Sequence, residues 1–230
     1  MMIKAVLLDL DDTLWPVAPV IRQAEATLQL WMEQHVPGVT QHYTIERLRE
    51  RRHALVQTDA RFQYDLWALR HALLSQVFAE HGAAPDLADR AMAVFADARN
   101  QVSLYADVRP ALLALASRVA LGTVSNGFAD LQAIGLASHF QVSIAAHRFG
   151  CAKPDARIFL AACAALQLAP QQVLYVGDDL LLDVQGAQQA GLRGGWMNRS
   201  GLQPDDTVHR HVKPDAEFRD LHDLHELLAG

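Results

Sequence analysis

Hydrophobic and polar residues follow two different patterns along this chain. After about residue 107, short apolar runs alternate with stretches that have apolar residues at helical spacing. Buried parallel strands are predicted over 119–124, 173–176 and, more weakly, 194–198, and the run over 6–8 predicts another near the start. Helices are expected over 111–117, 128–134, 155–166 and 184–190. The alternation predicts an α/β fold in which helices cover both faces of a parallel sheet.

The stretch from residue 16 to about 103 shows only helical spacing. Amphipathic segments are predicted at roughly 19–35, 45–58, 61–81 and 86–101. A helical insert after the first strand of an α/β core indicates a separate small domain over the carboxyl end of that strand. We therefore expect an α/β core domain of residues 1–14 and 104–230 and an all-helical domain of residues 15–103.

Composition places the chain among ordinary globular proteins. Of its 230 residues, 51% are hydrophobic and 20% are charged. The net charge of −6 disfavours nucleic acid as a partner, and no apolar run is long enough for a membrane span. The first residues lack the apolar region and cleavage site of a signal peptide. Cys151 and Cys163 have no metal-binding spacing, so we expect reduced thiols in a cytoplasmic protein that is a monomer or a homodimer.

Polar side chains gather directly after the predicted strands. Ligands of an open parallel sheet bind at the carboxyl ends of its strands, so these side chains are expected to meet at one edge. Carboxylates buried together repel one another and need a compensating cation, and a hard cation such as Mg²⁺ prefers oxygen ligands. Without such a partner, Asp12 or Thr13 would only cap a helix. The candidates are Asp9, Asp11, Asp12 and Thr13 after the first strand, Ser125 and Asn126 after the second, Asp178, Asp179 and Asp183 after the third, and Lys153 before a helix.

This set of side chains suits phosphoryl transfer. A carboxylate attacks phosphorus when its own charge and that of the phosphate are offset, and Mg²⁺ on Asp9 and Asp178, with Lys153 beside them, would offset both. The Ser125 hydroxyl and nearby backbone N–H groups would bind phosphoryl oxygens. Asp11 would protonate the departing alkoxide and then deprotonate a water molecule.

Four segments resemble, in chain order, the four motifs of the haloacid dehalogenase-like hydrolase superfamily. They are 9–14 (Asp-Leu-Asp-Asp-Thr-Leu), 125–127 (Ser-Asn-Gly), 153–155 (Lys-Pro-Asp) and 177–183 (Gly-Asp, four residues, Asp). The resemblance implies a Rossmann-like, doubly wound core with an inserted helical cap of the C1 type. It also implies that Asp9 is the nucleophile that forms an aspartyl-phosphate and that Asp11 is the general acid and base. By the same resemblance, phosphate is expected on Ser125, Asn126 and Lys153, Mg²⁺ on Asp9, the Asp11 carbonyl and Asp178, and supporting roles on Asp183, Asp179 and Thr13.

Within the superfamily, Asp11 favours a phosphatase acting on a small phosphorylated metabolite, because the dehalogenases as a family lack the second acid of the first motif. Segments such as 176–180 (Val-Gly-Asp-Asp-Leu), together with Trp196, are similar to bacterial phosphatases that act on FMN and on a ribityl-pyrimidine phosphate. A 2-haloacid dehalogenase, a phosphomutase and a non-catalytic phospholigand-binding protein on the same scaffold are the alternatives.

Substrate specificity is expected to reside in the helical domain. Aromatic side chains there would either offer a surface to a flat ring or pack inside the domain. The basic segment 47–52 is expected to be a solvated helix face, with one arginine in contact with a substrate anion as the alternative. The aromatic candidates are Trp15, Trp31, Phe62, Tyr64 and Trp67.

Overall fold

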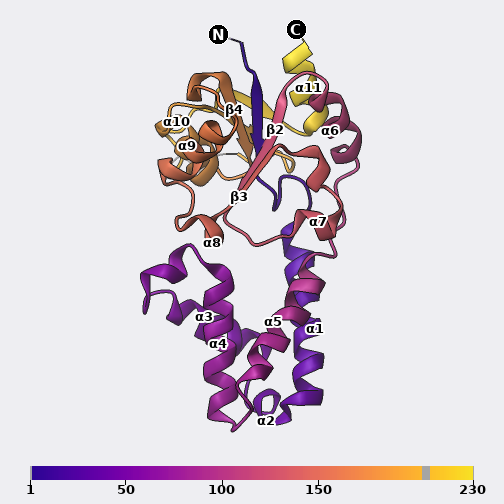
Figure 1. The fold of residues 1–230 in the computed structure, drawn as a ribbon, viewed down its shortest axis with the longest axis vertical. Helices are drawn as coiled ribbons and strands as arrows, with labels where there is room; N and C mark the ends of the chain where they lie inside the picture. Colours follow the sequence, from indigo (N-terminus) through magenta and orange to yellow (C-terminus); the bar gives the residue numbers. More distant parts are fainter. Residues whose placement is uncertain (1, 204–207, 230) are drawn as a thin grey trace.

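The computed structural model describes residues 2–203 and 208–229, and in this part of the chain a parallel sheet stands next to a separate group of helices (Figure 1). The strands are β1 (Ala5–Leu8), β2 (Ala120–Ser125), β3 (Val142–Ala145), β4 (Val173–Gly177), β5 (Arg193–Met197) and β6 (Ala216–Phe218). The α-helices are α1 (Val17–His35), α2 (Pro37–Thr40), α3 (Ile45–Leu55), α4 (Leu66–Glu80), α5 (Asp86–Arg99), α6 (Val108–Ala116), α7 (Leu131–Ile134), α8 (Ala146–Phe149), α9 (Ala156–Ala165), α10 (Gly186–Gln189) and α11 (Leu221–Ala229). Single 3₁₀ turns cover Ala60–Gln63, Ala137–His139 and Pro170–Gln172, and a π-helical turn covers Leu180–Gln185.

The first strand lies in the middle of the sheet. The strand order is β3-β2-β1-β4-β5-β6, and every neighbouring pair is parallel. Leu8, the last residue of β1, is in register with Thr123 of β2 and Val176 of β4. These three strands therefore end close together, and the segments that follow them emerge at one edge. The prediction of an α/β fold with a parallel sheet is confirmed.

Helices cover both faces of this sheet. Val6 and Leu8 of β1 pack into a hydrophobic core with α6 and α11, whereas Ala5 and Leu7 face a second core that includes α9 and α10. Figure 1 shows α9 and α10 on one side of the strands and α6 and α11 on the other. Burial on both faces explains why the central strands are continuous apolar runs, and it makes the architecture doubly wound.

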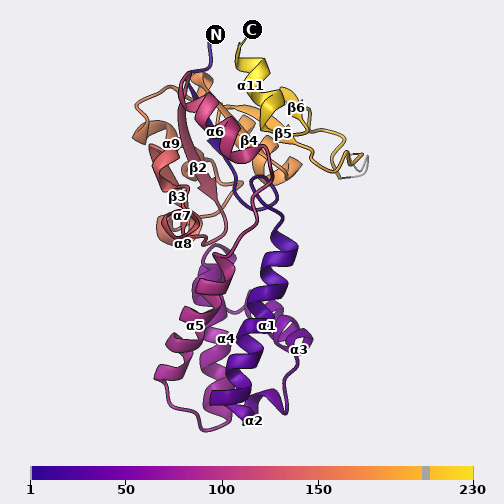
Figure 2. The ribbon, with the colours of Figure 1, turned by 90° about the vertical axis from the view of Figure 1, so that its right-hand side faces the viewer.

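Helices α1–α5, which we call the helical module (Val17–Arg99), surround a hydrophobic core of their own. Leu28, Leu73 and Phe95 come from three of these helices and are all nearly inaccessible to solvent. Figures 1 and 2 place the module beyond the carboxyl ends of the strands, with both chain ends at the opposite end of the molecule. Within the described residues, none of the helices has the length and apolar character needed to cross a membrane.

Several elements differ from the sequence-based prediction. The hydrophobic pattern does not predict β3, an edge strand whose residues are all partly or fully exposed, or β6, which has three residues. The helix predicted over 128–134 is reduced to Leu131–Ile134 because the Asp130 side chain begins it, accepting a hydrogen bond of 2.8 Å from the backbone N–H of Gln132. The helix predicted over 184–190 is divided into a π-helical turn and α10, and the one predicted over 61–81 into a 3₁₀ turn and α4.

Candidate active site

The carboxyl ends of β1, β2 and β4 enclose a cavity of about 180 Å³ that is lined mostly by polar side chains. Asp9 directly follows β1, and its backbone N–H donates to the carbonyl of Val176 in β4 at 2.9 Å. Of the predicted site residues, Thr13 is not in the lining; it is buried in the following turn, where its carbonyl accepts from Arg199 at 2.9 Å. The lining consists of Asp9, Asp11, Asp12, Ser125, Asn126, Gly127, Lys153, Asp178, Asp179, Leu182 and Asp183, and we call these residues the reaction centre.

Lys153 donates hydrogen bonds to three side chains at the reaction centre. Its Nζ donates to Asp9 Oδ1 at 2.7 Å, to Asp183 Oδ1 at 2.6 Å and to the Tyr175 hydroxyl at 2.9 Å, so all three of its protons are used. Burial by itself lowers the pKa of Lys153, but the adjacent carboxylates of Asp183 and Asp9 outweigh burial and hold that pKa above its ordinary value. The ammonium group therefore stays charged beside Asp9.

Tyr175 is a member of the site that the sequence does not single out. It lies inside β4 and is fully buried, with its hydroxyl donating to the Val124 carbonyl at 2.7 Å while accepting from Lys153. Burial and the nearby acids Asp183 and Asp9 keep its pKa well above the ordinary value, so the hydroxyl keeps its proton. Tyr175 thus ties the lysine to the sheet.

Asn126 fixes the segment that carries the lysine. Its side-chain carbonyl accepts from the Lys153 backbone N–H at 2.8 Å, and its amide nitrogen donates to the Lys153 carbonyl at 3.1 Å. Ser125 accepts at its Oγ from the Gly127 N–H at 3.0 Å, which leaves the hydroxyl proton available to a ligand. Asn126 therefore positions Lys153, and Ser125 retains a donor for an anion.

Three carboxylates are placed to share a cation. Asp9, Asp178 and Asp183 each offer an oxygen, and these oxygens lie within 4.8 Å of one another. Burial raises the pKa of Asp178 to about 7, with the charges of Asp183 and Asp12 adding to the effect. Burial likewise raises the pKa of Asp9 to about 8 against the opposing effect of Lys153. One ammonium group does not neutralise this set, and an all-oxygen donor set of this size fits a hard divalent cation.

Asp183 does more than complete that set. Its Oδ1 accepts from Lys153 and its Oδ2 accepts from the Asp179 backbone N–H at 2.9 Å, so both oxygens are engaged. A β-carbon on Gly177 would lie 2.2 Å from Asp183 Oδ2, and only glycine leaves room for the carboxylate at this close approach. Asp179 itself caps the π-helical turn, accepting from the N–H groups of Leu181 and Leu182 at 2.8 Å. Asp183 thus holds Lys153 and the turn after β4, and Asp179 holds the start of the π-helical turn.

Asp11 and Asp12 have different partners. Asp11 accepts from Trp15 Nε1 at 2.8 Å and from Arg99 Nη2 at 2.7 and 2.6 Å, one distance to each carboxylate oxygen. Asp12, with a φ of +56°, accepts from the Val17 N–H at 2.8 Å and so begins α1. Asp12 therefore stabilises the turn that leads into α1. Arg99, at the end of α5, is a second site residue that sequence patterns do not indicate, because it lies 88 positions from the carboxylate it contacts.

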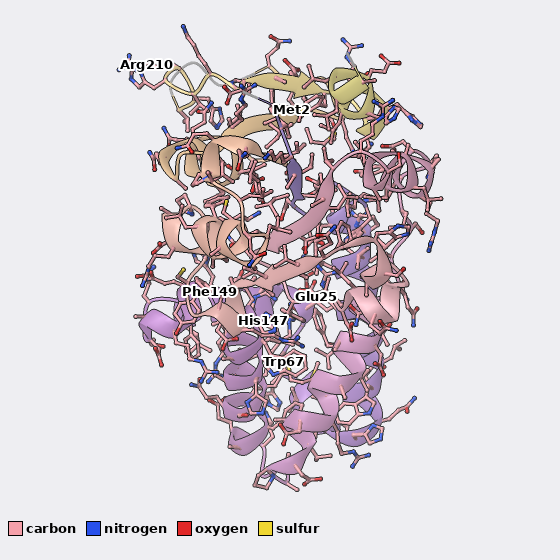
Figure 3. All side chains as sticks on the ribbon, turned by 45° about the horizontal axis from the view of Figure 1, so that its top comes forward. Met2, Glu25, Trp67, His147, Phe149 and Arg210 are labelled. Atoms are coloured by element: carbon pink, nitrogen blue, oxygen red, sulfur yellow. The ribbon has the colours of Figure 1, made fainter. Side chains whose placement is uncertain are left out.

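Aromatic contacts join the helical module to the core domain beside the reaction centre. Trp67 of α4 meets Phe128 edge to face with ring centroids 5.5 Å apart, and Phe128 meets His147 in the same way at 6.4 Å. Figure 3 shows Trp67 and His147 near each other at this junction. Trp15 is fully buried, and Trp31 stacks on His35 within the helical module. Trp15 thus packs the protein interior, whereas Trp31 is only partly buried and stacks on an exposed histidine.

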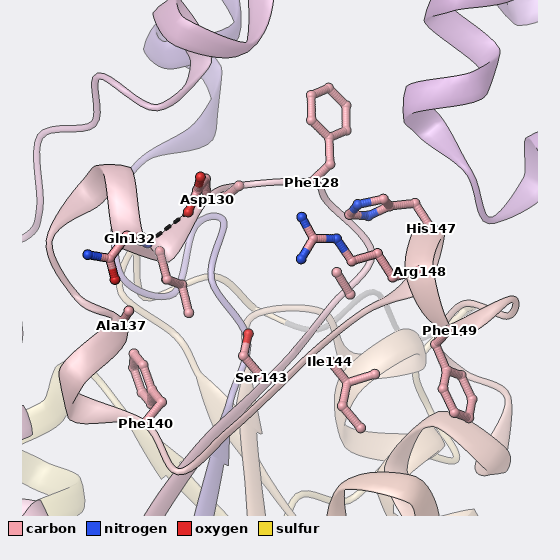
Figure 4. Close-up of a pocket in the computed structure, with 13 residues that line it drawn as sticks. Phe128, Asp130, Gln132, Ala137, Phe140, Ser143, Ile144, His147, Arg148 and Phe149 are labelled. Carbon is pink, nitrogen blue, oxygen red and sulfur yellow. Dashed lines mark hydrogen bonds between the residues drawn. The ribbon is translucent and has the colours of Figure 1, made fainter.

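A separate cavity of about 400 Å³ lies along the edge strand β3 (Figure 4). Figure 4 shows His147 and Arg148 on one side of it and Phe140 on the other. The carboxylate in its lining, Asp130, is occupied with the first N–H groups of α7. Among the residues that line it, none supplies the acid-and-lysine set of the reaction centre.

The acids, hydroxyl and lysine lie at the carboxyl edge of a doubly wound parallel sheet, where open sheets of this kind bind their ligands. A sequence profile of the haloacid dehalogenase-like hydrolases matches residues 3–191, and the chain belongs to this family. The resemblance noted from the four motifs is thereby confirmed.

Individual relatives cover almost the whole chain. A phosphoserine phosphatase of Thermus thermophilus is 31% identical over 96% of this chain and 97% of its own length. The 5-amino-6-(5-phospho-D-ribitylamino)uracil phosphatase YigB of Escherichia coli is 27% identical over 98% of this chain and 96% of its own. Among solved structures, a 2-haloacid dehalogenase from Pseudomonas syringae pv. Tomato DC3000 has a TM-score of 0.91 and 38% identity, with 99% of each chain covered.

Proposed function

We propose that this protein is a Mg²⁺-dependent phosphatase that hydrolyses a small phosphorylated metabolite through an aspartyl-phosphate on Asp9. The proposal depends on one observation: Asp9 and Asp11 line the same cavity but have different partners, Lys153 and Arg99. Asp9 lies against the charged Lys153, and Asp11 lines the same cavity two residues further on. One carboxylate is thus available as nucleophile and the other for proton transfer.

In the first step, an Asp9 oxygen attacks phosphorus and the bond between phosphorus and the ester oxygen breaks. Lys153 holds Asp9 Oδ1 at 2.7 Å and fixes the carboxylate for attack, while Ser125 donates its hydroxyl proton to a phosphoryl oxygen. Asp11 gives a proton to the leaving alkoxide, for which its ion pair with Arg99 must open.

In the second step, Asp11 takes a proton from a water molecule whose oxygen attacks phosphorus. The bond between phosphorus and Asp9 breaks, and inorganic phosphate and the Asp9 carboxylate are released. Asp9 and Asp178 would hold Mg²⁺, and Asp183 would support them. The metal, when bound, offsets the negative charge of the phosphate and of the attacking carboxylate.

The named relatives support a phosphatase, and the size of the site favours a small ester. Two relatives that span nearly the whole chain are phosphatases by name, one of phosphoserine and one of a ribitylaminouracil phosphate. The cavity between the helical module and the core domain that adjoins the reaction centre has a volume of about 260 Å³. This is at the lower limit of pockets that hold drug-sized ligands, about 300 Å³, so a compact metabolite fits better than FMN.

A second candidate function is a 2-haloacid dehalogenase, because the solved structure of a protein of that name is 38% identical to this chain. In that reaction Asp9 would attack carbon and release a halide, and no proton would be needed for the leaving group. The presence of Asp11 in the lining, held by Arg99 and Trp15, favours the phosphatase instead.

The test is hydrolysis of p-nitrophenyl phosphate by the purified protein with and without Mg²⁺. We expect turnover that EDTA abolishes and that Asp9→Asn lowers at least about 10³-fold, with Asp97→Asn, at an exposed position of α5, as the matched control. Full activity in Asp9→Asn would contradict the nucleophile assignment. Chloride release from 2-chloropropionate in EDTA, without phosphate release from any ester, would establish the dehalogenase.

A further inference from the structure

A second cavity, which we call the arginine cavity, is lined by residues of the helical module and of the sheet domain and adjoins the reaction centre. It has a volume of about 260 Å³ and shares two lining residues, Asp11 and Gly127, with the reaction centre. The alcohol part of an ester whose phosphate is at Asp9 would extend past Asp11 into this space. Its walls combine apolar side chains, Val17, Ile21, Leu66, Leu69, Phe95 and Phe128, with Arg52, Arg70 and Arg99.

Around Glu25 of α1, the nearby guanidinium groups outnumber the carboxylate that could neutralise them. Buried Glu25 accepts from Arg49 at its Oε2, with Arg49 Nε at 2.8 Å. Arg52 Nη1 and Arg70 Nη2 lie 3.5 and 3.8 Å from Glu25 Oε1, longer than the roughly 2.7–2.9 Å of a good charge-assisted hydrogen bond. One carboxylate thus faces three guanidinium groups, and the two that line the cavity are the weakly engaged ones.

Arg70 shows the consequence of that excess. Its side chain is 10% exposed, and its guanidinium carbon lies 3.7 Å from the centroid of the Phe95 ring. Burial lowers the pKa of Arg70 to about 9, and the positive charge of Arg52 adds to the effect while Glu25 opposes it. A further anion at this position would stabilise the charged form.

Arg99, which also lines the arginine cavity, provides an independent observation. Only 2% of its side chain is exposed, and its Nη2 is bound to Asp11. Its other terminal nitrogen, Nη1, is buried and has no hydrogen-bond acceptor among the described residues. An unpaired buried donor is unfavourable unless a ligand supplies the acceptor.

We infer that the arginine cavity binds a second anionic group of the substrate, carried on the alcohol part of the ester and recognised by Arg52, Arg70 and the free Nη1 of Arg99. The inference rests on the proposed phosphatase activity and narrows its substrate class. The substrate is a small phosphate monoester whose alcohol part has an apolar portion, for the hydrophobic walls, and ends in an anion such as a carboxylate. Guanidinium groups suit such an anion because their planar N–H pairs match its oxygens.

The experiment compares phosphate esters that differ only in this group. The probes are 4-carboxyphenyl phosphate, its uncharged carboxamide analogue, and 4-phosphonophenyl phosphate. We expect kcat/KM for at least one anionic ester to exceed that for the carboxamide by about tenfold or more, the effect of a hydrogen bond to a charged group. The preferred anion then distinguishes a carboxylate from a phosphoryl group as the natural partner.

Variants locate the effect within the protein. Arg70→Gln and Arg52→Gln should each bring the ratio of anionic to carboxamide ester close to one, whereas Arg22→Gln, at an exposed position of α1, should keep the wild-type ratio. Circular dichroism and thermal melting show whether Arg70→Gln folds. If it does not, the ratio in Arg52→Gln, at a partly exposed position, is compared with the wild-type ratio to test the proposal. The ratio is measured within each variant, so a general loss of turnover does not affect it.

The outcomes separate the two proposals. Hydrolysis of all three esters by the wild type with a ratio near one would overturn the arginine cavity as an anion site and leave the phosphatase intact. Unchanged ratios in folded Arg70→Gln and Arg52→Gln would overturn it as well. No hydrolysis of any ester with Mg²⁺ would overturn the phosphatase itself, and the substrate class with it.

Discussion

The reaction centre and the arginine cavity are neighbours, yet their residues come together in different ways. Ser125 ends a central strand, and Asp9 and Asp178 each directly follow one, so the register of a parallel sheet is sufficient to bring them to one edge. Arg52, Arg70 and Arg99 come from the ends or faces of three separate helices. The comparison teaches that chemistry tied to strand ends is predictable from sequence, whereas specificity tied to helix packing is not.

The two regions also carry opposite excesses of charge. The reaction centre has carboxylates in excess over Lys153, which fits a cation, and the arginine cavity has guanidinium groups in excess over Glu25, which fits an anion. Substitutions in the reaction centre should therefore impair hydrolysis whether or not the ester carries a second anion. Substitutions in the arginine cavity should change the preference among esters.

Replacement of Lys153 should have the largest effect, because Lys153 donates hydrogen bonds to three side chains at the reaction centre. Lys153→Met leaves Asp9 and Asp183 without their buried partner, and loss of one member of a buried ion pair costs about 3–5 kcal/mol of unfolding free energy. Urea denaturation followed by circular dichroism measures the loss, with exposed Lys213→Met as the control. A stability within about 1 kcal/mol of wild type would show that the carboxylates do not depend on the lysine.

Replacement of Asp11 should lower turnover according to the leaving group. Asp11→Asn removes the proton donor, so hydrolysis of an alkyl phosphate such as ethyl phosphate should fall about 10²–10⁴-fold. The fall should be smaller for p-nitrophenyl phosphate, whose leaving group needs little protonation. Steady-state kcat values for the two esters check this expectation. Equal losses for both would indicate that Asp11 acts only through structure.

The tyrosine that supports the lysine should have a smaller effect. Tyr175→Phe removes a hydroxyl that accepts from Lys153 and donates to the Val124 carbonyl, leaving both groups short of a partner in a buried place. Such a loss costs about 1–3 kcal/mol. Thermal and urea melts measure it. The ratio between anionic and uncharged esters should not change, and a change would mean that the two regions are coupled.

Metal affinity should rise with pH, and this is the smallest effect. Because burial raises the pKa of Asp178 to about 7, that carboxyl is largely protonated at about pH 6 and ionised at about pH 8. An acid whose pKa is higher in the folded than in the unfolded chain binds protons better when folded, so the metal-free protein loses stability as pH rises through that interval. Mg²⁺ binds the ionised form and should raise the melting temperature more at about pH 8 than at about pH 6. A larger shift at the lower pH would argue against Asp178 as a ligand.

Sequence patterns predict much of the fold because the central strands are apolar on both faces. They fail for β3, since an edge strand with exposed residues has no continuous apolar run, and for the π-helical turn after Asp179, whose geometry depends on the capping of its first N–H groups. Two helices begin later than the hydrophobic pattern predicts, because the side chains of Asp65 and Asp130 cap their first N–H groups.

The site shows the same division. Asp9, Asp11, Ser125, Lys153 and Asp178 all line one cavity, as their motifs indicate. Tyr175 escapes prediction because, within a buried strand, a tyrosine that packs and one that binds a lysine have the same pattern. Segment 47–52 is largely solvated, as expected, with Arg47, Arg49 and Glu50 exposed. Sequence does not show that Arg49 and Arg52 also pair with a buried glutamate from another helix, because only tertiary packing creates that contact.

Two roles are open to the aromatic residues of the helical module, a surface for a flat ring or packing inside the domain, and the lining of the arginine cavity does not support the first. The cavity next to the reaction centre is lined by Phe95 and Phe128, and none of the five aromatic residues that the sequence suggested is in its lining. Trp67 contributes indirectly, through its ring contact with Phe128. Helical spacing identifies which residues face inward, but it does not distinguish the interior of a helix group from the surface it presents to another domain.

The most direct test of the central claim is to trap the phosphorylated enzyme. The wild-type protein with Mg²⁺ is mixed with p-nitrophenyl phosphate, quenched in acid within one turnover and digested for mass spectrometry. We predict one phosphoryl group on the peptide that contains Asp9, sensitive to hydroxylamine as an acyl phosphate is, and absent from Asp9→Asn. A phosphoryl group on Ser125 or on another residue, or full turnover by Asp9→Asn, would contradict Asp9 as the nucleophile.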